Sequence, residues 1–219
     1  MDSKPTLYTY CVAHDGGTAP NPYGNTCTLA ICKPRIRLSA KEGDWIVGTT
    51  SQKAGSNFNM VYAMRVTQKM TLRDYDEYCQ NHLQSKLPKP NSKKYSDRQG
   101  DCIYDFHHSP DHPLIRKNDN HDERHRGRDL SGHNVLLSDT YYYFGDKAPS
   151  IPEGLHNIIK IGPGHKSGSN DPFLNDFLTW ISDLDKKYGV GIHGSPLLQT
   201  QKEKEFKFKN ANCAGGGES

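Results

Sequence analysis

The chain has 219 residues, of which 33% are hydrophobic and 24% are charged, and its mean hydropathy is -0.84. Its net charge of +3 and pI near 8.4 are too weakly basic for a protein that wraps duplex DNA through phosphate contacts alone, so an anionic partner is expected to bind locally. No apolar stretch approaches the roughly 20 residues that a membrane span requires, and the first residues do not resemble a signal peptide. We therefore expect a soluble protein of the cytoplasm, or of the host cytoplasm if the protein is viral.

The polar composition favours a single domain over residues 1–198, with a long polar insertion at about 82–128 and a disordered tail at 199–219. The tail alternates Lys and Glu and ends in glycines, without a core-forming pattern. The cysteines form no Cys-x-x-Cys pair and mostly lie in apolar runs, which predicts buried, reduced thiols. They are Cys11, Cys27, Cys32, Cys79, Cys102 and Cys213.

The first predicted strand covers residues 7–13, and the second covers residues 26–32. The proline-rich loop between them can form neither a helix nor a central strand. After the second strand, Arg35, Arg37 and Lys41 place several positive charges in a short stretch. This stretch is either a solvated connection or an edge that faces an anion.

The central part of the chain predicts a strand, a polar loop, a second strand and a helix. The apolar runs at residues 45–48 and 61–67 are the strands, and residues 51–59 form a loop with many hydrogen-bond donors. Such loops between rigid strands commonly hold ligands. Thr71 followed by Asp74 resembles a capping box and predicts a helix start. The residues on one side of this helix are Leu72, Tyr75 and Tyr78.

The polar insertion has few aliphatic residues and is expected to be mostly irregular, with some strand character at residues 100–108. His107 and His112, together with a carboxylate, have the chemistry to bind zinc or iron, but no recognised zinc spacing is present, so no metal is expected. The favoured alternative is a hydrophilic loop with one or two hydrogen-bonded histidines. The clustered histidines are His107, His108, His112, His121, His125 and His133, with Asp105, Asp111, Asp122 and Glu123 between them.

Strand patterning resumes at residues 134–138 and 141–144. The four aromatic residues of the second segment alternate between the two faces of the sheet. One face must join the core. The other is either packed in the ordinary way or offers a surface on which a base stacks.

Residues 162–168 read Gly-Pro-Gly-His-Lys-Ser-Gly, which is the most chemically suggestive short run in the chain. Glycines allow backbone N–H groups to converge on an anion, and Lys166 and Ser167 add a charge and a hydroxyl. The spacing is not that of a Walker A loop, and a flexible loop is the alternative.

Asp171 and Pro172 then predict the start of an amphipathic helix that ends near Gly189 and covers the sheet. Its apolar stripe is Leu174, Phe177, Leu178, Ile181 and Leu184.

Several motifs follow one another between Leu7 and Gly189: Ala19-Pro20-Asn21-Pro22, Cys27-Thr28-Leu29-Ala30, Cys32-Lys33-Pro34, Gly43-Asp44-Trp45-Ile46-Val47-Gly48-Thr49, Val61-Tyr62-Ala63-Met64-Arg65-Val66-Thr67, His107-His108-Ser109, Val135-Leu136-Leu137-Ser138, Tyr143-Phe144-Gly145 and Gly164-His165-Lys166-Ser167. As an ordered set they resemble the nucleotide-modification-associated domain, type 2. The resemblance implies a phage or bacterial setting of DNA base modification and host–virus conflict, without a settled reaction.

The succession of strand, polar loop, strand and helix in the central part is also similar to the PUA-like barrels, including the EVE and ASCH groups. This similarity implies an α+β fold, with a small mixed β-barrel flanked by helices, a long polar insertion and a disordered C-terminal tail. In such folds a cleft of the barrel holds a nucleobase or nucleotide, so the functional implication is an analogy of fold.

The favoured function is binding of a nucleobase or nucleotide, either a modified base extruded from DNA or a free nucleotide signal that the protein sequesters. Stacking is expected on Trp45, Tyr8, Tyr10 or Tyr143, with hydrogen bonds and phosphate contacts from polar side chains. The expected ligand-binding residues are Tyr10, Asn21, Lys33, Trp45, Thr49, Ser51, Lys53, Tyr143, Gly164, His165, Lys166 and Ser167.

The alternative function is an enzyme that modifies nucleotides or DNA bases. His107, His108 and His165 are its candidate acids or bases, and Lys166 would stabilise charge on phosphate. No carboxylate dyad, nucleophile elbow or cofactor loop is recognisable, so no cofactor is expected and the catalytic residues stay open. A role limited to protein–protein contacts is a third alternative, and the sequence leaves homo-oligomerisation open.

Overall fold

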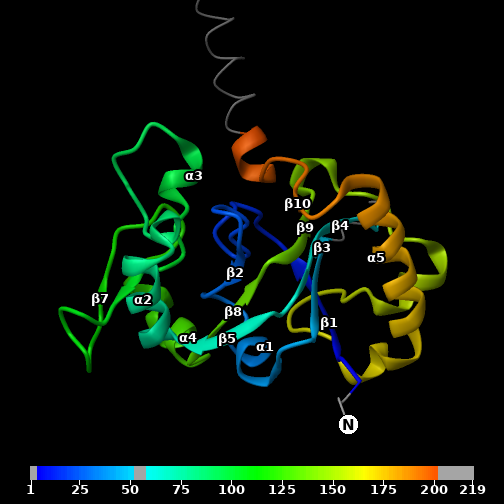
Figure 1. The fold of residues 1–219 in the computed structure, drawn as a ribbon, viewed down its shortest axis with the longest axis horizontal. Coiled ribbons are helices and arrows are strands. Elements are labelled where there is room, and N and C mark those ends of the chain that lie inside the picture. Colours follow the sequence, from blue (N-terminus) through cyan, green and yellow to red (C-terminus); the bar gives the residue numbers. More distant parts are fainter. Residues whose placement is uncertain (1–3, 52–57, 202–219) are drawn as a thin grey trace, which may run out of the picture.

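The computed structural model describes residues 4–51 and 58–201, which form a mixed α+β fold with several sheets (Figure 1). The larger sheet has five strands in the order β1-β3-β4-β9-β10. β1 and β3 are parallel, β4 is antiparallel to both β3 and β9, and β10 is parallel to β9. The strands are β1 (Leu7–Val12), β3 (Trp45–Thr50), β4 (Met60–Arg65), β9 (Thr140–Tyr143) and β10 (Gly191–Ile192).

A smaller sheet has the order β2-β8-β5, with β2 (Cys27–Leu29), β8 (Asn134–Ser138) and β5 (Gln68–Thr71). One antiparallel ribbon joins the two sheets, because the pairing of β4 with β9 continues into that of β5 with β8. Arg65 lies opposite Thr140 in the larger sheet, and Gln68 lies opposite Leu137 in the smaller one, without a change of register. Among the described strands no pairing closes these sheets into a barrel, so the expected closed barrel is not formed.

The helix α5 (Leu174–Tyr188) covers one face of the larger sheet (Figure 1). The predicted stripe is confirmed, since Leu174, Phe177, Ile181 and Leu184 are buried in one cluster with the sheet. Gly189 ends the helix with a φ of 70°, as its position predicts. The segment that starts at Asp171-Pro172 belongs to a 3₁₀ turn, η5 (Gly168–Phe173), so the α-helix begins later than expected.

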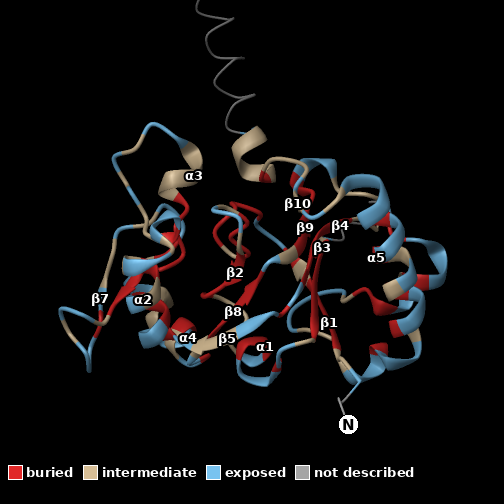
Figure 2. Ribbon diagram, in the orientation of Figure 1, coloured by how far each residue is buried: buried red, intermediate tan, exposed pale blue. Residues whose placement is uncertain are grey.

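The helix α2 (Leu72–Asn81) packs on the smaller sheet. The side chain of Thr71 accepts a hydrogen bond from the backbone N–H of Asp74 at 3.1 Å, which confirms the predicted N-cap. Its buried residues are Leu72, Tyr75, Asp76 and Cys79, whereas Tyr78, predicted on the same side as Leu72 and Tyr75, is only partly buried. Figure 2 shows the same pattern throughout the fold, with burial concentrated in the central strands and exposure on the outer helix faces.

The insertion at residues 82–128 is packed against the β2 region through buried polar groups. The Lys86 ammonium is fully buried and donates to the backbone oxygens of Asn21 and Thr26 at 2.9 and 2.6 Å. Asp101 accepts hydrogen bonds from Thr28 at 2.6 Å and Tyr75 at 2.8 Å. The elements of the insertion are η1 (Gln84–Lys86), α3 (Tyr95–Arg98), β6 (Tyr104–Asp105), β7 (Leu114–Ile115) and η2 (Glu123–His125), so the predicted strand at 100–108 is reduced to two residues.

The remaining elements are α1 (Pro34–Ser39), α4 (Arg126–Leu130), η3 (Gly145–Lys147) and η4 (Glu153–Ile158). No helix in the described ranges is long and apolar enough to cross a membrane. Residues 199–201, where the tail was expected to begin, continue a helical turn, and Thr200 donates to Asp146 at 3.1 Å. The rest of that tail lies outside the described residues.

The predicted second strand ends early, and this shortening shapes the functional site. β2 stops at Leu29, and the chain turns sharply because Cys32 and Lys33 both have positive φ, at 59° and 40°. Non-glycine residues adopt this left-handed backbone rarely, and they do so most often at turns and functional sites. Pro34 then starts α1. Cys32 is therefore a turn residue, although the sequence suggested a strand.

Candidate functional site

A cavity of about 440 Å³ opens beyond the C-terminal end of β1, and we call it the main cavity. Its walls come from three parts of the chain: the end of β1 with the following loop, the turn at Cys32 and Lys33, and residues 120–128 of the insertion. Leu198, near the end of the described chain, also lines it.

A second cavity of about 390 Å³ lies between this turn with α1 and the glycine-rich loop, and we call it the glycine-loop cavity. Pro163, Gly164 and His165 form one side of it. Cys32, Lys33 and Arg128 line both cavities. The two cavities are therefore adjacent and share a wall that carries a thiol and two cationic side chains.

Lys33 is held at this shared wall by local contacts. Its ammonium lies 4.3 Å from the centre of the Tyr10 ring and donates to the backbone oxygen of Cys11 at 3.4 Å. Burial lowers the pKa of Lys33, and the nearby charge of Arg128 lowers it further. A partly desolvated ammonium of this kind gains more from an anionic partner than an ammonium in open water.

His165 contributes an imidazole to the glycine-loop cavity. Burial, followed by the positive charges of Arg35 and Lys33, lowers its pKa, so the ring is neutral at pH 7. Its ring centre lies 5.8 Å from that of Tyr8. His165 can therefore donate or accept a hydrogen bond, while Arg35 and Lys33 supply the positive charge of this cavity.

A thiol, an imidazole and a carboxylate form a hydrogen-bonded series at the main cavity. The Cys32 Sγ lies 3.5 Å from His121 Nε2, and His121 Nδ1 lies 2.8 Å from Asp129 Oδ2. Burial by itself lowers the pKa of His121, but the hydrogen bonds to Asp129 and Cys32 raise it to about 9. His121 is therefore a cation at neutral pH, within reach of the thiol.

Asp129 is fully buried and its carboxylate is occupied on both oxygens. Oδ1 accepts the backbone N–H of Cys32 at 2.9 Å, and Oδ2 accepts from His121 and from the Tyr104 hydroxyl at 3.2 Å. Burial alone raises the pKa of Asp129, but the His121 hydrogen bond, the Cys32 N–H and the Arg37 charge lower it overall. Asp129 thus stays ionised and fixes both the ring of His121 and the backbone of Cys32.

The Arg37 guanidinium holds the turn at Cys32 against the insertion and β8. It is fully buried and donates to the backbone oxygens of Cys32 and Asn134 at 2.7 Å each, and also to that of Asp129. These three oxygens belong to separate parts of the chain. Arg37, one of the basic residues between the second strand and the centre of the sequence, is therefore neither a solvated connection nor an anion-facing edge.

Four residues predicted to bind ligand line the two adjacent cavities: Tyr10 and Lys33 at the main cavity, and Lys33, Gly164 and His165 at the glycine-loop cavity. Tyr10 does not offer a free ring face, because Lys33 covers it and the hydroxyl pairs with Tyr62 at 2.8 Å. The ring thus lines the cavity beneath an ammonium.

The other predicted binding residues lie elsewhere. Trp45 packs edge-on against Phe177 in the core, with ring centres 5.5 Å apart. Asn21, Thr49 and Tyr143 are buried and bond within the fold, Tyr143 through a 2.5 Å contact with Asp15. Trp45, Thr49 and Lys166 do not share a cavity among those found in the described ranges.

Three further predicted residues adjoin the site or lie on the surface. Lys166 pairs its backbone with Thr9, and its ammonium donates to the backbone oxygen of Asn157. Ser167 follows it in the chain and is half-buried, whereas Ser51 is exposed at the end of β3. Lys53 lies outside the described residues.

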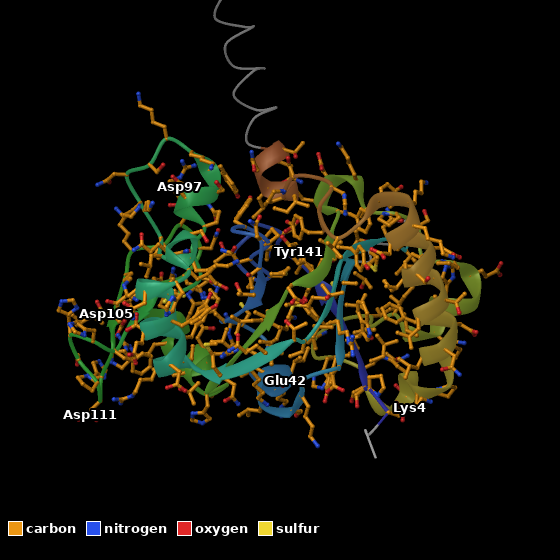
Figure 3. All side chains as sticks on the ribbon, in the orientation of Figure 1. Lys4, Glu42, Asp97, Asp105, Asp111 and Tyr141 are labelled. Atoms are coloured by element: carbon orange, nitrogen blue, oxygen red, sulfur yellow. The ribbon has the colours of Figure 1, made fainter. Side chains whose placement is uncertain are left out.

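The predicted catalytic histidines of the insertion are exposed and lie away from the main cavity. His107 lines a different hollow beside α2, of about 520 Å³, and His108 pairs with Asp105 at 2.7 Å. Figure 3 places Asp111 at the outer edge of the insertion, where it is exposed. Of the six clustered histidines, His121 and His125 are the two that line the main cavity.

The sequence reasoning missed Cys32, His121 and Asp129 as a unit. In the described part of the chain they are the one group whose ligand atoms lie close enough to hold a metal, within 4.8 Å of one another. Cys32 and His121 are 89 residues apart, so no short spacing could reveal them. Of the five cysteines described, all of which are free, Cys27, Cys79 and Cys102 are buried as expected, whereas Cys11 and Cys32 are partly exposed.

The protein is therefore a mixed α+β protein with two adjacent cavities whose shared wall carries a thiol and two cationic side chains. The chain matches the family described as nucleotide modification associated domain 2 over residues 4–204, and it belongs to that family. Neither the curated proteins nor the solved structures contain a match to it. The family resemblance noted from the sequence motifs is thereby confirmed.

Proposed function

We propose that the protein binds a nucleobase or nucleotide in the adjacent main and glycine-loop cavities. The observation that carries this proposal is the shared wall, where Lys33 and Arg128 face both cavities of a chain from a nucleotide-modification family. The cavities measure about 440 and 390 Å³, within the range of roughly 300–1,000 Å³ that is usual for small-molecule sites.

The charges suggest how such a ligand would lie. Lys33, Arg35 and Arg128 supply the cations that a phosphate requires, and all three line the glycine-loop cavity. His14, Asn120 and further polar side chains line the main cavity, where they can meet the edge of a base. The phosphate is therefore assigned to the shared wall and the base to the main cavity.

The binding test is a titration of the purified protein with nucleoside monophosphates, triphosphates and cyclic dinucleotides by calorimetry. A charge-assisted hydrogen bond is worth about 1.5–3 kcal/mol, so K33M should weaken binding by roughly tenfold or more. K117M is the matched control, since Lys117 is an exposed lysine that lines neither cavity. Equal affinities of K33M and K117M would contradict the assignment, as would the absence of binding to every nucleotide.

The biological setting that follows is DNA modification or host–virus conflict in the cytoplasm, with either a free nucleotide or a modified DNA base as the partner. The two partners are distinguished by gel shifts with modified and unmodified single-stranded DNA at low and high salt. A free nucleotide would be released intact when the freshly purified protein is denatured. A retained DNA oligonucleotide and a salt-sensitive shift would support the base-reading version.

A further inference from the structure

We propose that Cys32 is a nucleophile that attacks the base of the bound nucleotide, with His121 as its proton partner and Asp129 as the positioning residue. This inference rests on the proposed nucleotide binding, because it takes the cavity's ligand as the substrate. It goes beyond binding in assigning covalent chemistry to a residue that the sequence placed among structural thiols.

The first support is the placement of the thiol. Cys32 lies at the sharp turn between β2 and α1, in a left-handed backbone conformation with a φ of 59°, and it lines both cavities. A nucleophile carried on a strained turn between a strand and a helix has its reactive atom exposed to the ligand. Cys32 therefore combines access from the cavities with a rigid backbone.

The second support is the connection from thiol to imidazole to carboxylate. An activated thiol needs a base or a protonated histidine within hydrogen-bond reach, and that group needs a third one to orient it. The Sγ to Nε2 distance is 3.5 Å, and the Nδ1 to Oδ2 distance is 2.8 Å, so His121 uses one ring nitrogen toward each neighbour. Cys32 comes from the β2–α1 turn, His121 from the residues just before η2, and Asp129 from α4. Together these three side chains meet both requirements.

The third support concerns the role of the Cys32–His121–Asp129 group. It is either a proton relay, in which hydrogen bonds link the three side chains, or a metal site. A metal held by this group would need an oxygen of Asp129, but both oxygens already accept hydrogen bonds from His121, Tyr104 and the Cys32 backbone. Removing Asp129 from the ligand set leaves one sulfur and one nitrogen, fewer than the three protein ligands of a catalytic zinc site. The orienting role therefore fits the hydrogen bonds of Asp129 better than ligation does.

Several cationic groups surround the Cys32 thiol. The cations that face it are His121, Lys33, Arg37 and Arg128, and the His125 ring lies 4.7 Å from that of His121. The anion that faces it is Asp129, whose charge is directed at His121 and the Cys32 N–H. Cysteines in such electropositive, partly exposed surroundings are the reactive ones.

The chemistry of a thiolate narrows the substrate class to pyrimidine nucleotides. A soft nucleophile adds to the polarised C5–C6 double bond of uracil or cytosine, whereas a purine ring lacks such a bond. In this step the sulfur–C6 bond forms, the C5–C6 π pair moves toward the C4 substituent, and His121 gives its proton to C5. His121 then takes a proton back from C5 and the thiolate is eliminated, which restores both reactants, so no further reagent is consumed.

The reactivity test is alkylation of the full chain with iodoacetamide at pH 6, read by peptide mass spectrometry. Cys11 serves as an internal control, because it is also partly exposed and lines the main cavity but has no histidine partner in the described hydrogen bonds. Cys32 should react at least about tenfold faster than Cys11, and H121Q should remove that difference. Equal rates in the wild type, or unchanged rates in H121Q, would overturn the proposal.

The positioning role of Asp129 is tested through the pH profile of the same reaction. D129N removes the charge that keeps His121 protonated, so the profile of Cys32 alkylation should shift to higher pH. Circular dichroism at each pH shows whether the variant is folded, and H121N gives a second, milder change at the relay. A profile of D129N that coincides with the wild type would contradict the role.

The substrate test is hydrogen exchange at C5 of dUMP and dCMP in deuterium oxide, read by mass spectrometry. The wild type should add one mass unit to the nucleotide, whereas C32A should bind it by calorimetry without exchange. Binding without exchange in the wild type would overturn the covalent step and leave the proposed function intact. Absence of binding in all forms would refute the proposed function, and the alkylation rates would still decide whether Cys32 is activated.

One zinc ion per chain in metal analysis would contradict the relay.

Discussion

Replacement of Arg37 by Met is the perturbation whose effect follows most directly from the structure. The guanidinium is fully buried and donates to backbone oxygens of Cys32, Asn134 and Asp129. Met has a similar length but no donor, so R37M leaves all three oxygens without this partner. The change separates the β2–α1 turn from α4 and from β8.

The expected loss of stability comes from those buried oxygens. Each buried group left without a hydrogen bond costs about 1–3 kcal/mol, and breaking a buried charge network typically costs about 3–5 kcal/mol. Some relaxation will admit water, so we take about 3 kcal/mol as the lower bound for the fall in unfolding free energy. Burial lowers the pKa of Arg37 to about 10, which leaves the side chain protonated at neutral pH.

Urea denaturation followed by circular dichroism measures this loss. R35M is the matched control, because Arg35 is an exposed residue of the same helix, and its unfolding free energy should change by less than about 0.5 kcal/mol. R37M should also slow Cys32 alkylation, since the turn loses its alignment with His121. A fall of less than about 1 kcal/mol in R37M would refute the claim that this guanidinium holds the site together.

The remaining predictions concern pH and packing. The folded pKa of His121, about 9, lies above its ordinary value of 6.5 because its hydrogen bonds outweigh burial. The contribution of protonated His121 to the unfolding free energy is therefore complete below pH 6.5. It is lost as the pH rises to about 9. The wild type should lose up to about 3 kcal/mol across that window by urea denaturation, and an equal loss in H121Q would exclude His121 as the cause. K86M should lower the unfolding free energy by about 3 kcal/mol or more, because the buried backbone oxygens of Asn21 and Thr26 lose the Lys86 ammonium as their donor. An unchanged melting temperature would be incompatible with these hydrogen bonds. G48A should destabilise by about 1–3 kcal/mol, since its Cβ would lie 2.4 Å from the Tyr62 ring. G127A, which meets nothing within 4 Å, should be neutral or stabilising, and matching effects in these two variants would contradict the packing argument.

Local signals in the sequence predicted the parts of the fold that local interactions determine. The cap at Thr71 and the apolar stripe of α5 are visible because they depend on residues three or four positions apart. Of the ribbon that joins the sheets, β4, β8 and β9 lie in runs with strand patterning, whereas β5 (Gln68–Thr71) was not predicted as a strand. The pairing between distant strands is not encoded in local patterns, and the small mixed β-barrel implied by the fold similarity is not formed by the described strands.

The site was less predictable because its geometry depends on distant contacts. Trp45 looks like a stacking platform from its type and position, but its ring is needed in the core beneath α5. Cys32 lies in an apolar run that reads as a strand, and only the folded chain shows its left-handed turn. His121 reaches it from the insertion, whose polar composition indicated mainly a loop, and Asp129 reaches it from α4.

The central claim, that a nucleotide occupies the cavities where Cys32 and Lys33 meet, is tested most directly by ligand protection. Cys32 alkylation is measured with and without a saturating concentration of the tightest-binding nucleotide from the calorimetric series. The account predicts that the nucleotide slows alkylation of Cys32 by at least about tenfold, since the bound state excludes the reagent. A nucleotide that binds the protein and leaves the alkylation rate of Cys32 unchanged would contradict it.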